Sequence, residues 1–278
     1  MGLTSMSHAT DQEKFEREFS ARNYLQNYYP KADLQMVSKY VVEKTAAAET
    51  MRIMMFLDAV CAPLIRAVFG KEKAVMLELG GGPTLYQLMN TIDEVKEVHF
   101  TDFVEDNLRE IRLWKNGENG AYNWRSFFEA ALMIRKDAVQ VSDEEVENLE
   151  SDLRRKVTSI GYCDVFRDNL GIADTNYDVI STHFVAESAT TSKEEWAKAL
   201  KNMHLKLNPK GLLFMSALRG AKSSYKVLDD EFPAVELYED DMEQGLKEAG
   251  FSVIRISSIH TEDKSNNYEG FMFIAAQK

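Results

Sequence analysis

The stretch that decides the fold is residues 74–86, which read AVMLELGGGPTLY. The first six residues are apolar except for Glu78, which is typical of a buried strand, and the segment after Pro83 is typical of a helix. Three glycines lie between them. Because glycine has no Cβ, the chain can turn sharply here and bring its N–H groups against a ligand. This stretch predicts a strand, a ligand-binding loop and a helix.

The spacing of the glycines argues against two common ligand loops. A phosphate-binding loop of the ATPase type requires a lysine after its last glycine, and no lysine follows Gly82. A dinucleotide loop requires a third glycine where this chain has Leu85. The remaining pattern is an acidic residue followed by two spaced glycines, formed by Glu78, Gly80 and Gly82. A purely structural turn stays open as the alternative, because glycine first answers a need of the backbone.

A second carboxylate, Asp102, ends the expected strand 97–102, about 20 residues beyond the glycines. In a doubly wound sheet this position meets the ribose hydroxyls of a bound ligand, and a carboxylate can accept both of them. The alternative is that Asp102 caps the helix that begins near Val104. Capping and ribose binding are compatible at one position.

Strand and helix signals alternate along the chain. We expect strands near 73–79, 97–102, 157–163, 177–182, 211–217, 251–258 and 269–276. We expect helices near 11–19, 33–47, 49–69, 85–91, 104–115, 122–136, 143–156, 193–206 and 239–249. This order predicts an α/β fold with a mostly parallel seven-stranded sheet and helices on both faces.

The length of the chain is sufficient for a core and a cap. Of the 278 residues, 45% are hydrophobic. We expect a core at 71–278, with insertions near 120–155 and 219–237, and an N-terminal helical cap at 1–70. Ligands in such folds lie beyond the carboxyl ends of the strands, so the cap and insertions should cover the ligand and shape the substrate pocket.

Further motifs occur in a fixed order: YLQNYY at 24–29, GGGPTLYQL at 80–88, TDF at 101–103 followed by Asn107, YCDV at 162–165, IST at 180–182, LNPKGL at 207–212, EG at 269–270 and AQK at 276–278. Together they resemble the family of nicotinamide, phenylethanolamine and thioether/indolethylamine methyltransferases. The likeness runs from Tyr24 to the last residue. It implies a Rossmann-like class I methyltransferase that uses S-adenosylmethionine (SAM) and yields S-adenosylhomocysteine.

The resemblance also implies which residues hold the cofactor. Its methionine end would be lined by Tyr24, Tyr29, Gly80, Gly81, Gly82, Thr84 and Tyr86. Its ribose would be held by Asp102 and Asn107, and its adenine by Asp164 and Val165. Thr182 would line the space near its sulfonium. Packing is the alternative role for the tyrosines, a strand end for Asp164 and a helix cap for Thr84.

The ends of the fourth and fifth strands would face the methyl group. His183 could accept a proton and Glu187 could anchor an ammonium, so we take these two as catalytic candidates. With Ser216 and Arg219 they are also the substrate-binding candidates; the Arg219 guanidinium suits a carboxylate and suggests an amino-acid-like acceptor. Each candidate has an alternative role. His183 could be a hydrogen-bonded core residue, and Glu187 a carboxylate in the first turn of a helix. Arg219 could form an ion pair with Asp229, Asp230 or Glu231.

Departures from the family concern the substrate. The nicotinamide enzymes carry Asp where this chain has Ser216, and the phenylethanolamine enzymes carry Glu where it has Arg219. The acidic residue that the phenylethanolamine enzymes place after the fourth strand aligns with Ala186. Neither substrate is supported by these positions.

Composition limits the partners. A formal net charge of −12 argues against nucleic acid, whose phosphates need a basic face. Two cysteines and five histidines show neither a disulfide framework nor metal-ligand spacing, so we expect no metal. No apolar run approaches the ~18 residues of a membrane span, and we expect a cytoplasmic monomer or dimer.

The function predicted from these observations is transfer of a methyl group from SAM to a nitrogen of a small amine or amino-acid-like metabolite. Methylation of oxygen or sulfur on a small metabolite is the nearest alternative, because the same cofactor site would serve it. A SAM-binding regulatory protein without catalysis is a second alternative. A nicotinamide-dinucleotide oxidoreductase is disfavoured by Leu85.

Overall fold

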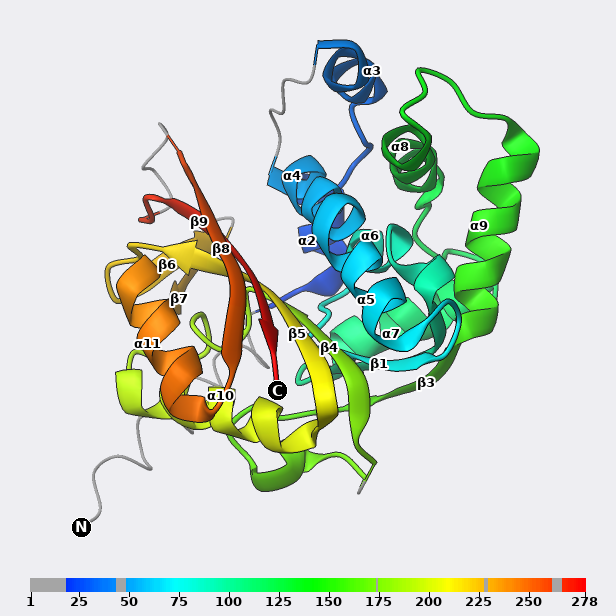
Figure 1. Cartoon of the computed structure of the whole chain (residues 1–278). Helices are drawn as coiled ribbons and strands as arrows, with labels where there is room; N and C mark the ends of the chain where they lie inside the picture. The colour runs from blue at the N-terminus through cyan, green and yellow to red at the C-terminus, as the bar shows by residue number, and fades with distance from the viewer. Residues whose placement is uncertain (1–18, 44–48, 174, 228–229, 262–266) are drawn as a thin grey trace.

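A computed structural model of the chain describes residues 19–43, 49–173, 175–227, 230–261 and 267–278. Its centre is a seven-stranded sheet with the order β3-β2-β1-β4-β5-β9-β8 (Figure 1). The strands are β1 Ala74–Leu79, β2 Val95–Asp102, β3 Val157–Tyr162, β4 Tyr177–His183, β5 Leu207–Arg219, β8 Ser252–His260 and β9 Gly270–Gln277. The first five are parallel to one another, and β9 is antiparallel to both β5 and β8. The expected seven strands and mostly parallel sheet are confirmed.

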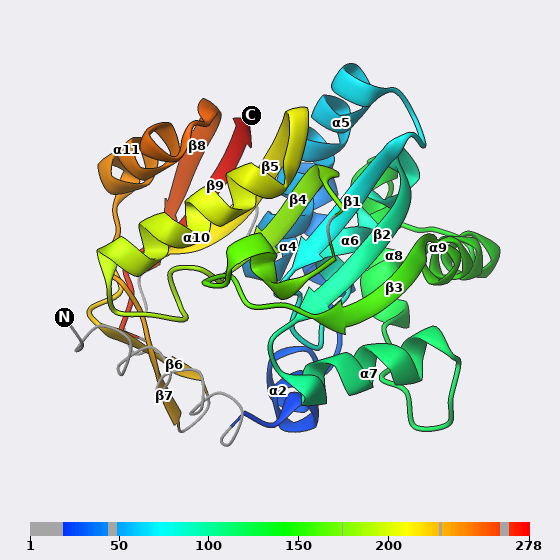
Figure 2. The ribbon, with the colours of Figure 1, turned by 90° about the horizontal axis from the view of Figure 1, so that it is seen from below.

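Each face of the sheet has its own hydrophobic core, because successive side chains of a strand point to opposite sides. In β4, Val179 belongs to one core and Ile180 to the other; in β5, Phe214 and Leu213 divide in the same way. Figure 2 shows α10 (Lys193–Lys206) and α11 (Glu239–Ala249) on one face. The other face is covered by α4 Glu49–Phe56, α5 Ala62–Phe69, α7 Glu105–Lys115, α8 Arg125–Lys136 and α9 Asp143–Lys156.

The helices expected at 49–69 and after the first strand are present, with differences in their bounds. The helix expected at 122–136 begins at Arg125. The helix expected at 85–91 is a single turn, α6 Tyr86–Met89, followed by the 3-10 turn η2 Ile92–Glu94. The segment expected as one helix at 49–69 contains a π-helical turn, η1 Leu57–Cys61. Pro63 follows it and has no N–H to donate to the carbonyl four residues back, which explains the widened turn.

Near the N-terminus, α2 Ala21–Tyr28 was not expected as a helix, and α3 Leu34–Glu43 lies within the expected 33–47. The helix expected at 11–19 lies outside the described residues except at its last position. Within the insertion expected at 219–237, the chain forms an unexpected hairpin of β6 Ser224–Val227 and β7 Asp230–Pro233. The division into a cap and a core stays a prediction.

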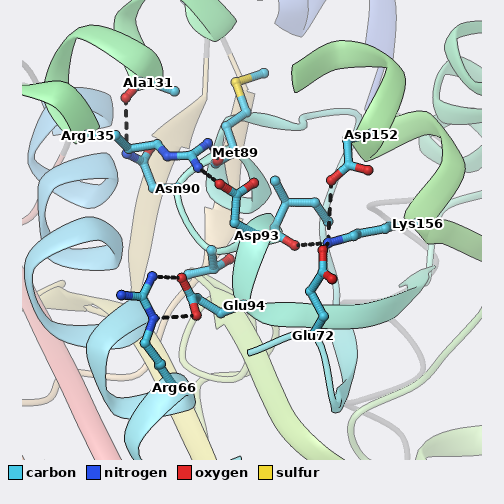
Figure 3. Close-up of polar contacts among 12 residues, drawn as sticks. Arg66, Glu72, Met89, Asn90, Asp93, Glu94, Ala131, Arg135, Asp152 and Lys156 are labelled. Carbon is cyan, nitrogen blue, oxygen red and sulfur yellow. Dashed lines mark hydrogen bonds and ion pairs between the residues drawn. The ribbon is translucent and has the colours of Figure 1, made fainter. Parts of the chain in front are cut away.

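A charged network ties the helices to the turn that begins β2 (Figure 3). The Lys156 side chain is 2% exposed; its ammonium lies 3.1 Å from a Glu72 carboxylate oxygen and donates to the Ile92 carbonyl over 2.9 Å. The Arg66 Nε donates to Glu94 over 2.9 Å, and Arg135 pairs with Asp93. These contacts lie at the amino end of β2, whereas the candidate site residue Asp102 lies at its carboxyl end.

Candidate functional site

A cavity of about 430 Å³ opens at the carboxyl ends of β1, β2 and β4. Its volume is within the range of small-molecule sites, roughly 300–1,000 Å³. The predicted cofactor residues that line it are Tyr24, Tyr29, Gly80, Gly81, Gly82, Thr84, Tyr86, Asp102, Asn107, Asp164 and Val165. These residues come from segments far apart in the sequence. They lie together because the loops after parallel strands meet at one edge of the sheet.

The glycine loop after β1 has two residues in the left-handed region, Gly80 at φ +68° and Gly82 at φ +62°. A Cβ added to Gly80 would lie 2.5 Å from a Val185 methyl carbon, so that position has no room for a side chain. A Cβ added to Gly82 would meet nothing closer than the Thr84 hydroxyl at 4.0 Å. The Thr84 hydroxyl donates to the Gly81 carbonyl over 2.9 Å and thereby holds the turn. The loop leaves open space above Gly82 for a ligand.

The Asp102 carboxylate accepts three hydrogen bonds. Oδ2 accepts from the Gly82 N–H over 2.8 Å; Oδ1 accepts from the Val104 N–H over 2.8 Å and from the Asn107 amide over 2.9 Å. Burial raises the pKa of Asp102, and these donors partly offset that shift. The Asn107 side-chain oxygen is buried and has no hydrogen-bond partner among the described residues. Val104, not Asp102, is the N-cap residue of α7, but Asp102 does satisfy its N–H.

The adenine candidates lie directly after β3. The Asp164 carboxylate accepts from the Phe166 N–H over 3.0 Å and lies 3.3 Å from the Arg167 Nε. Both Asp164 and Val165 are buried in the cavity wall, beside Phe103. A carboxylate and apolar side chains around one end of a cavity suit a flat ring with polar edges.

Tyr24 of α2 and Tyr29, the residue that follows this helix, line the cavity together with the glycine loop. The Tyr29 ring stacks on Tyr86, with centroids 5.4 Å apart, and its hydroxyl lies 3.3 Å from that of Tyr24. The Tyr122 hydroxyl donates to the Tyr29 carbonyl over 2.7 Å. At the other end of α2, the Ala21 N–H donates to Asp106 of α7 over 3.0 Å. These hydrogen bonds fix both ends of α2 on the rest of the fold and so position Tyr24 and Tyr29 at the cavity.

His183 lines the cavity and is held between two serines. Its Nε2 lies 3.1 Å from the Ser181 hydroxyl, and its Nδ1 lies 2.8 Å from that of Ser216. Burial lowers the pKa of His183 to about 3, so the imidazole is neutral at neutral pH. Ser216 does not line the cavity and contacts it through His183.

Glu187 is fully buried behind the cavity wall. One carboxylate oxygen accepts from the Leu218 N–H over 3.0 Å, and the other has no partner among the described residues. Burial raises the pKa of Glu187 to about 7. Thr182 is also buried outside the lining, with its hydroxyl oxygen unpartnered among the described residues.

Arg219 pairs with carboxylates of the protein itself. Its Nε lies 3.0 Å from Glu239 and its Nη1 lies 2.8 Å from Glu269, and neither partner was anticipated. The guanidinium also lies 4.9 Å from the centre of the Tyr238 ring. Arg219 does not line the cavity, so the structure does not bring it together with His183.

Two features of the site were not among the predicted site residues, although Glu78 was part of the glycine-loop pattern. The carboxyl of Glu78 lies beneath the glycine loop, fully buried, and neither oxygen reaches a partner at hydrogen-bond distance among the described residues. Burial raises its pKa to about 8, and the charge of the nearby Asp102 adds to that shift. The other feature is a set of aromatic side chains that line the cavity, which we call the aromatic wall: Phe184, Tyr225, Tyr268 and Phe271. Aromatic residues near strand ends were the available signal for this wall.

The strand order, the glycine loop after β1 and the carboxylate that ends β2 define a class I SAM-dependent methyltransferase. The solved structure of magnesium protoporphyrin IX methyltransferase from Synechocystis PCC 6803 with bound SAM shares this fold, with a TM-score of 0.53 and 12% identity over 98% of this chain and 97% of that one. The chain belongs to the NNMT/PNMT/TEMT family, whose model matches residues 7–278.

Named members of the family align with the chain over most of its length. Mouse (Mus musculus) indolethylamine N-methyltransferase is 27% identical over 96% of this chain and 95% of its own. Human (Homo sapiens) nicotinamide N-methyltransferase is 25% identical over 97% and 96%. Rat (Rattus norvegicus) phenylethanolamine N-methyltransferase is 27% identical over 73% and 72%.

The residues present fit SAM as the methyl donor. The open space at Gly82 and the unpartnered Asn107 oxygen beside Asp102 are the features that a bound cofactor would use. Among the described residues, no group of three or more His, Cys, Asp or Glu side chains could hold a metal ion. In the same part of the chain, no helix has the length and apolar character needed to cross a bilayer.

Proposed function

We propose that this methyltransferase transfers the methyl group of SAM to a nitrogen atom of a small amine. The observation that carries the proposal is the arrangement of Gly82, Asp102 and Asn107 on the cavity wall, in a chain of a family whose named relatives are N-methyltransferases. SAM supplies an electrophilic methyl group when it is bound. Asp102 and Asn107 would hold the ribose, Asp164 and Val165 the adenine, and the glycine loop with Tyr24 and Tyr29 the methionine end.

The remaining task of the protein is to position the reactants. Reacting atoms must be held roughly 3–3.5 Å apart and in line, and a neutral amine requires no base for the methyl transfer itself. The neutral His183 fits this scheme, because a charged imidazole in the wall would repel a positively charged cofactor. Tyr24 and Tyr29 would exclude water from the site.

The aromatic wall supports an acceptor with an apolar body. Phe184, Tyr268 and Phe271 give such a body a large contact surface. The expectation of an amino-acid-like acceptor rested on Arg219, whose guanidinium is engaged by Glu239 and Glu269. The proposed methyl acceptor is therefore a small amine that does not need a carboxylate.

Calorimetry and a methyl-transfer assay test the proposal in two steps. Purified protein should bind SAM and S-adenosylhomocysteine, and Asp102→Ala should weaken both. Labelled SAM is then offered with indolethylamine, nicotinamide, phenylethanolamine, a phenol and a thioether, and the product is analysed for the methylated atom. Binding without transfer to any of a wide set of metabolites would favour the regulatory alternative. Transfer only to oxygen or sulfur would refute the nitrogen assignment.

The proposed cellular setting follows the same reasoning. We propose a cytoplasmic enzyme that acts on a free small molecule, without nucleic acid or membrane partners, as a monomer or dimer. The net charge of −12 supports the exclusion of phosphate-rich partners. We also propose that residues 1–70 act as a cap over the cofactor, which the contacts of α2 with the cavity support.

A further inference from the structure

Arg219, the last residue of β5, connects three segments that are far apart in the sequence. Its side chain is 14% exposed and contacts Glu239 at the start of α11 and Glu269 before β9. Its guanidinium also packs on the ring of Tyr238. A planar guanidinium presents several donors in a fixed geometry, so a single side chain can hold two carboxylates.

Glu269 lies within the segment that forms the aromatic wall. Its backbone N–H donates to the Arg219 carbonyl over 2.8 Å, and its carboxylate accepts from the Arg219 Nη1 over 2.8 Å. A Cβ added to Gly220 would lie 2.9 Å from the Glu269 Cγ, so the Glu269 side chain packs closely on the chain after β5. Its position is thus set by both a backbone and a side-chain bond to the same residue.

The neighbours of this contact face the cavity although Arg219 does not. Leu218 precedes Arg219, and Tyr268 precedes Glu269; both line the cavity. The Tyr268 ring contacts Phe271, with centroids 5.1 Å apart, and Phe271 contacts Phe184 with centroids 5.4 Å apart. A shift of Glu269 would therefore move the aromatic wall without touching the glycine loop.

We propose that Arg219 is a positioning residue for the methyl acceptor: through Glu269 it holds the wall of Tyr268 and Phe271 in place and thereby determines which acceptors fit. This inference rests on the proposed function. It replaces the direct contact with a substrate carboxylate that the sequence suggested for Arg219. Glu239, the other partner of Arg219, lies on α11. Its ion pair with Arg219 stabilises the fold and does not determine the position of the aromatic wall.

The two carboxylates on one guanidinium supply a matched experiment. Glu269→Gln, Glu239→Gln, Arg219→Gln and Arg219→Lys are compared with the unchanged protein. Backbone amide exchange is followed by mass spectrometry for peptides covering residues 267–273. Glu269→Gln and Arg219→Gln should increase the exchange rate of this segment by about tenfold, as loss of a charge-assisted hydrogen bond predicts. Glu239→Gln should leave that rate unchanged while lowering the melting temperature, and Arg219→Lys should restore part of the protection.

Kinetics with an acceptor that the unchanged enzyme methylates provide the second readout. Glu269→Gln and Arg219→Gln should raise the acceptor KM by about tenfold, alter the ratio of kcat/KM between two acceptors and leave the Kd for SAM within about twofold. Glu239→Gln should alter neither the KM nor that ratio.

Equal effects of Glu239→Gln and Glu269→Gln on exchange at 267–273 would overturn the inference and assign Arg219 a purely structural role. An unchanged acceptor KM in Glu269→Gln would also overturn it. Failure of the proposed function has a different signature, namely that the unchanged protein binds SAM but methylates none of the acceptors. Amide exchange still tests the wall in that case.

Discussion

Asn107 donates its side-chain amide to the Asp102 carboxylate over 2.9 Å and keeps a buried carbonyl oxygen without a partner among the described residues. The amide helps to orient the carboxylate, while the free oxygen adds an acceptor beside it. Two hydroxyl donors on adjacent carbons need such a pair of acceptors. This relationship connects the end of β2 with α7, and both residues would face the ribose of the proposed cofactor.

Asp102→Asn should weaken SAM binding and lower the stability of the fold by comparable free energies. The amide keeps the shape of the carboxylate but replaces one oxygen by an NH2 group. Whichever way the amide is turned, that group faces a donor, either the Gly82 N–H on the Oδ2 side or the Val104 N–H on the Oδ1 side. We expect a loss of about 10-fold to 100-fold in SAM affinity and about 1–3 kcal/mol in the free energy of unfolding. Calorimetry and urea unfolding measure the two effects.

Asp143→Asn is the control for that prediction, because Asp143 is 89% exposed on α9. It should leave SAM affinity unchanged. Equal SAM affinity in Asp102→Asn and the unchanged protein would contradict the ribose assignment.

Gly80→Ala and Gly82→Ala should separate stability from binding. Both residues have a positive φ, which costs about 1–2 kcal/mol for a residue with a Cβ. Only Gly80→Ala also collides with Val185 at 2.5 Å, so it should lower the free energy of unfolding more. In Gly82→Ala the added methyl group extends into the open space proposed for SAM. This variant should therefore also bind SAM about tenfold more weakly. Chemical unfolding with and without SAM checks both; a larger stability loss in Gly82→Ala would be contrary to this account.

Glu78→Gln should change how stability depends on pH. The folded-state pKa of Glu78 is about 8 against an ordinary 4.5, so the folded protein binds more protons than the unfolded chain between these values. Its contribution is fully present below pH 4.5 and is lost as the pH rises through 8, by about 1.4 kcal/mol per pKa unit. The stability of Glu78→Gln relative to the unchanged protein should therefore improve from pH 5 to pH 9.

Urea unfolding across that range measures the difference between the two proteins. Glu145→Gln is the control, because hydrogen bonds, above all from Lys136, lower the pKa of Glu145 to about 2 and it stays ionised throughout. The difference between this control and the unchanged protein should be constant above pH 5. A constant difference for Glu78→Gln as well would show that Glu78 does not titrate in this range.

Lys156→Ala should destabilise the protein without affecting the cofactor. The buried ammonium satisfies the Ile92 carbonyl, and its loss should cost about 1–3 kcal/mol in the free energy of unfolding. Lys156→Met keeps the apolar stem and should recover part of that loss. The Kd for SAM should be unchanged in both, because the network lies at the opposite end of β2. A weakened SAM affinity in Lys156→Met would show that the two ends are coupled.

Local patterns in the chain were sufficient to predict the sheet, the glycine turn after β1 and the carboxylate that ends β2. Tyr24, Tyr29, Asp164 and Val165 were named from the family resemblance, and the cofactor-binding roles of all these residues stay predictions. Buried parallel strands are continuous apolar runs, and the glycines after β1 meet a backbone requirement that is visible within a few residues. Asp102 could be placed because the ends of adjacent parallel strands lie at one edge of the sheet. Confirmation of the seven strands in the expected ranges follows from this locality.

The acceptor end depends on contacts between distant segments, and the sequence could not specify it. Arg219 looked like a ligand for an anion, but folding places Glu239 and Glu269 beside it, 20 and 50 residues further along the chain. His183 looked like a base, but Ser181 and Ser216 enclose it, and burial lowers its pKa to about 3, which makes it a weak proton acceptor. The charge state and the partners of such groups are set by which segments pack around them, and no local pattern of residues records that packing.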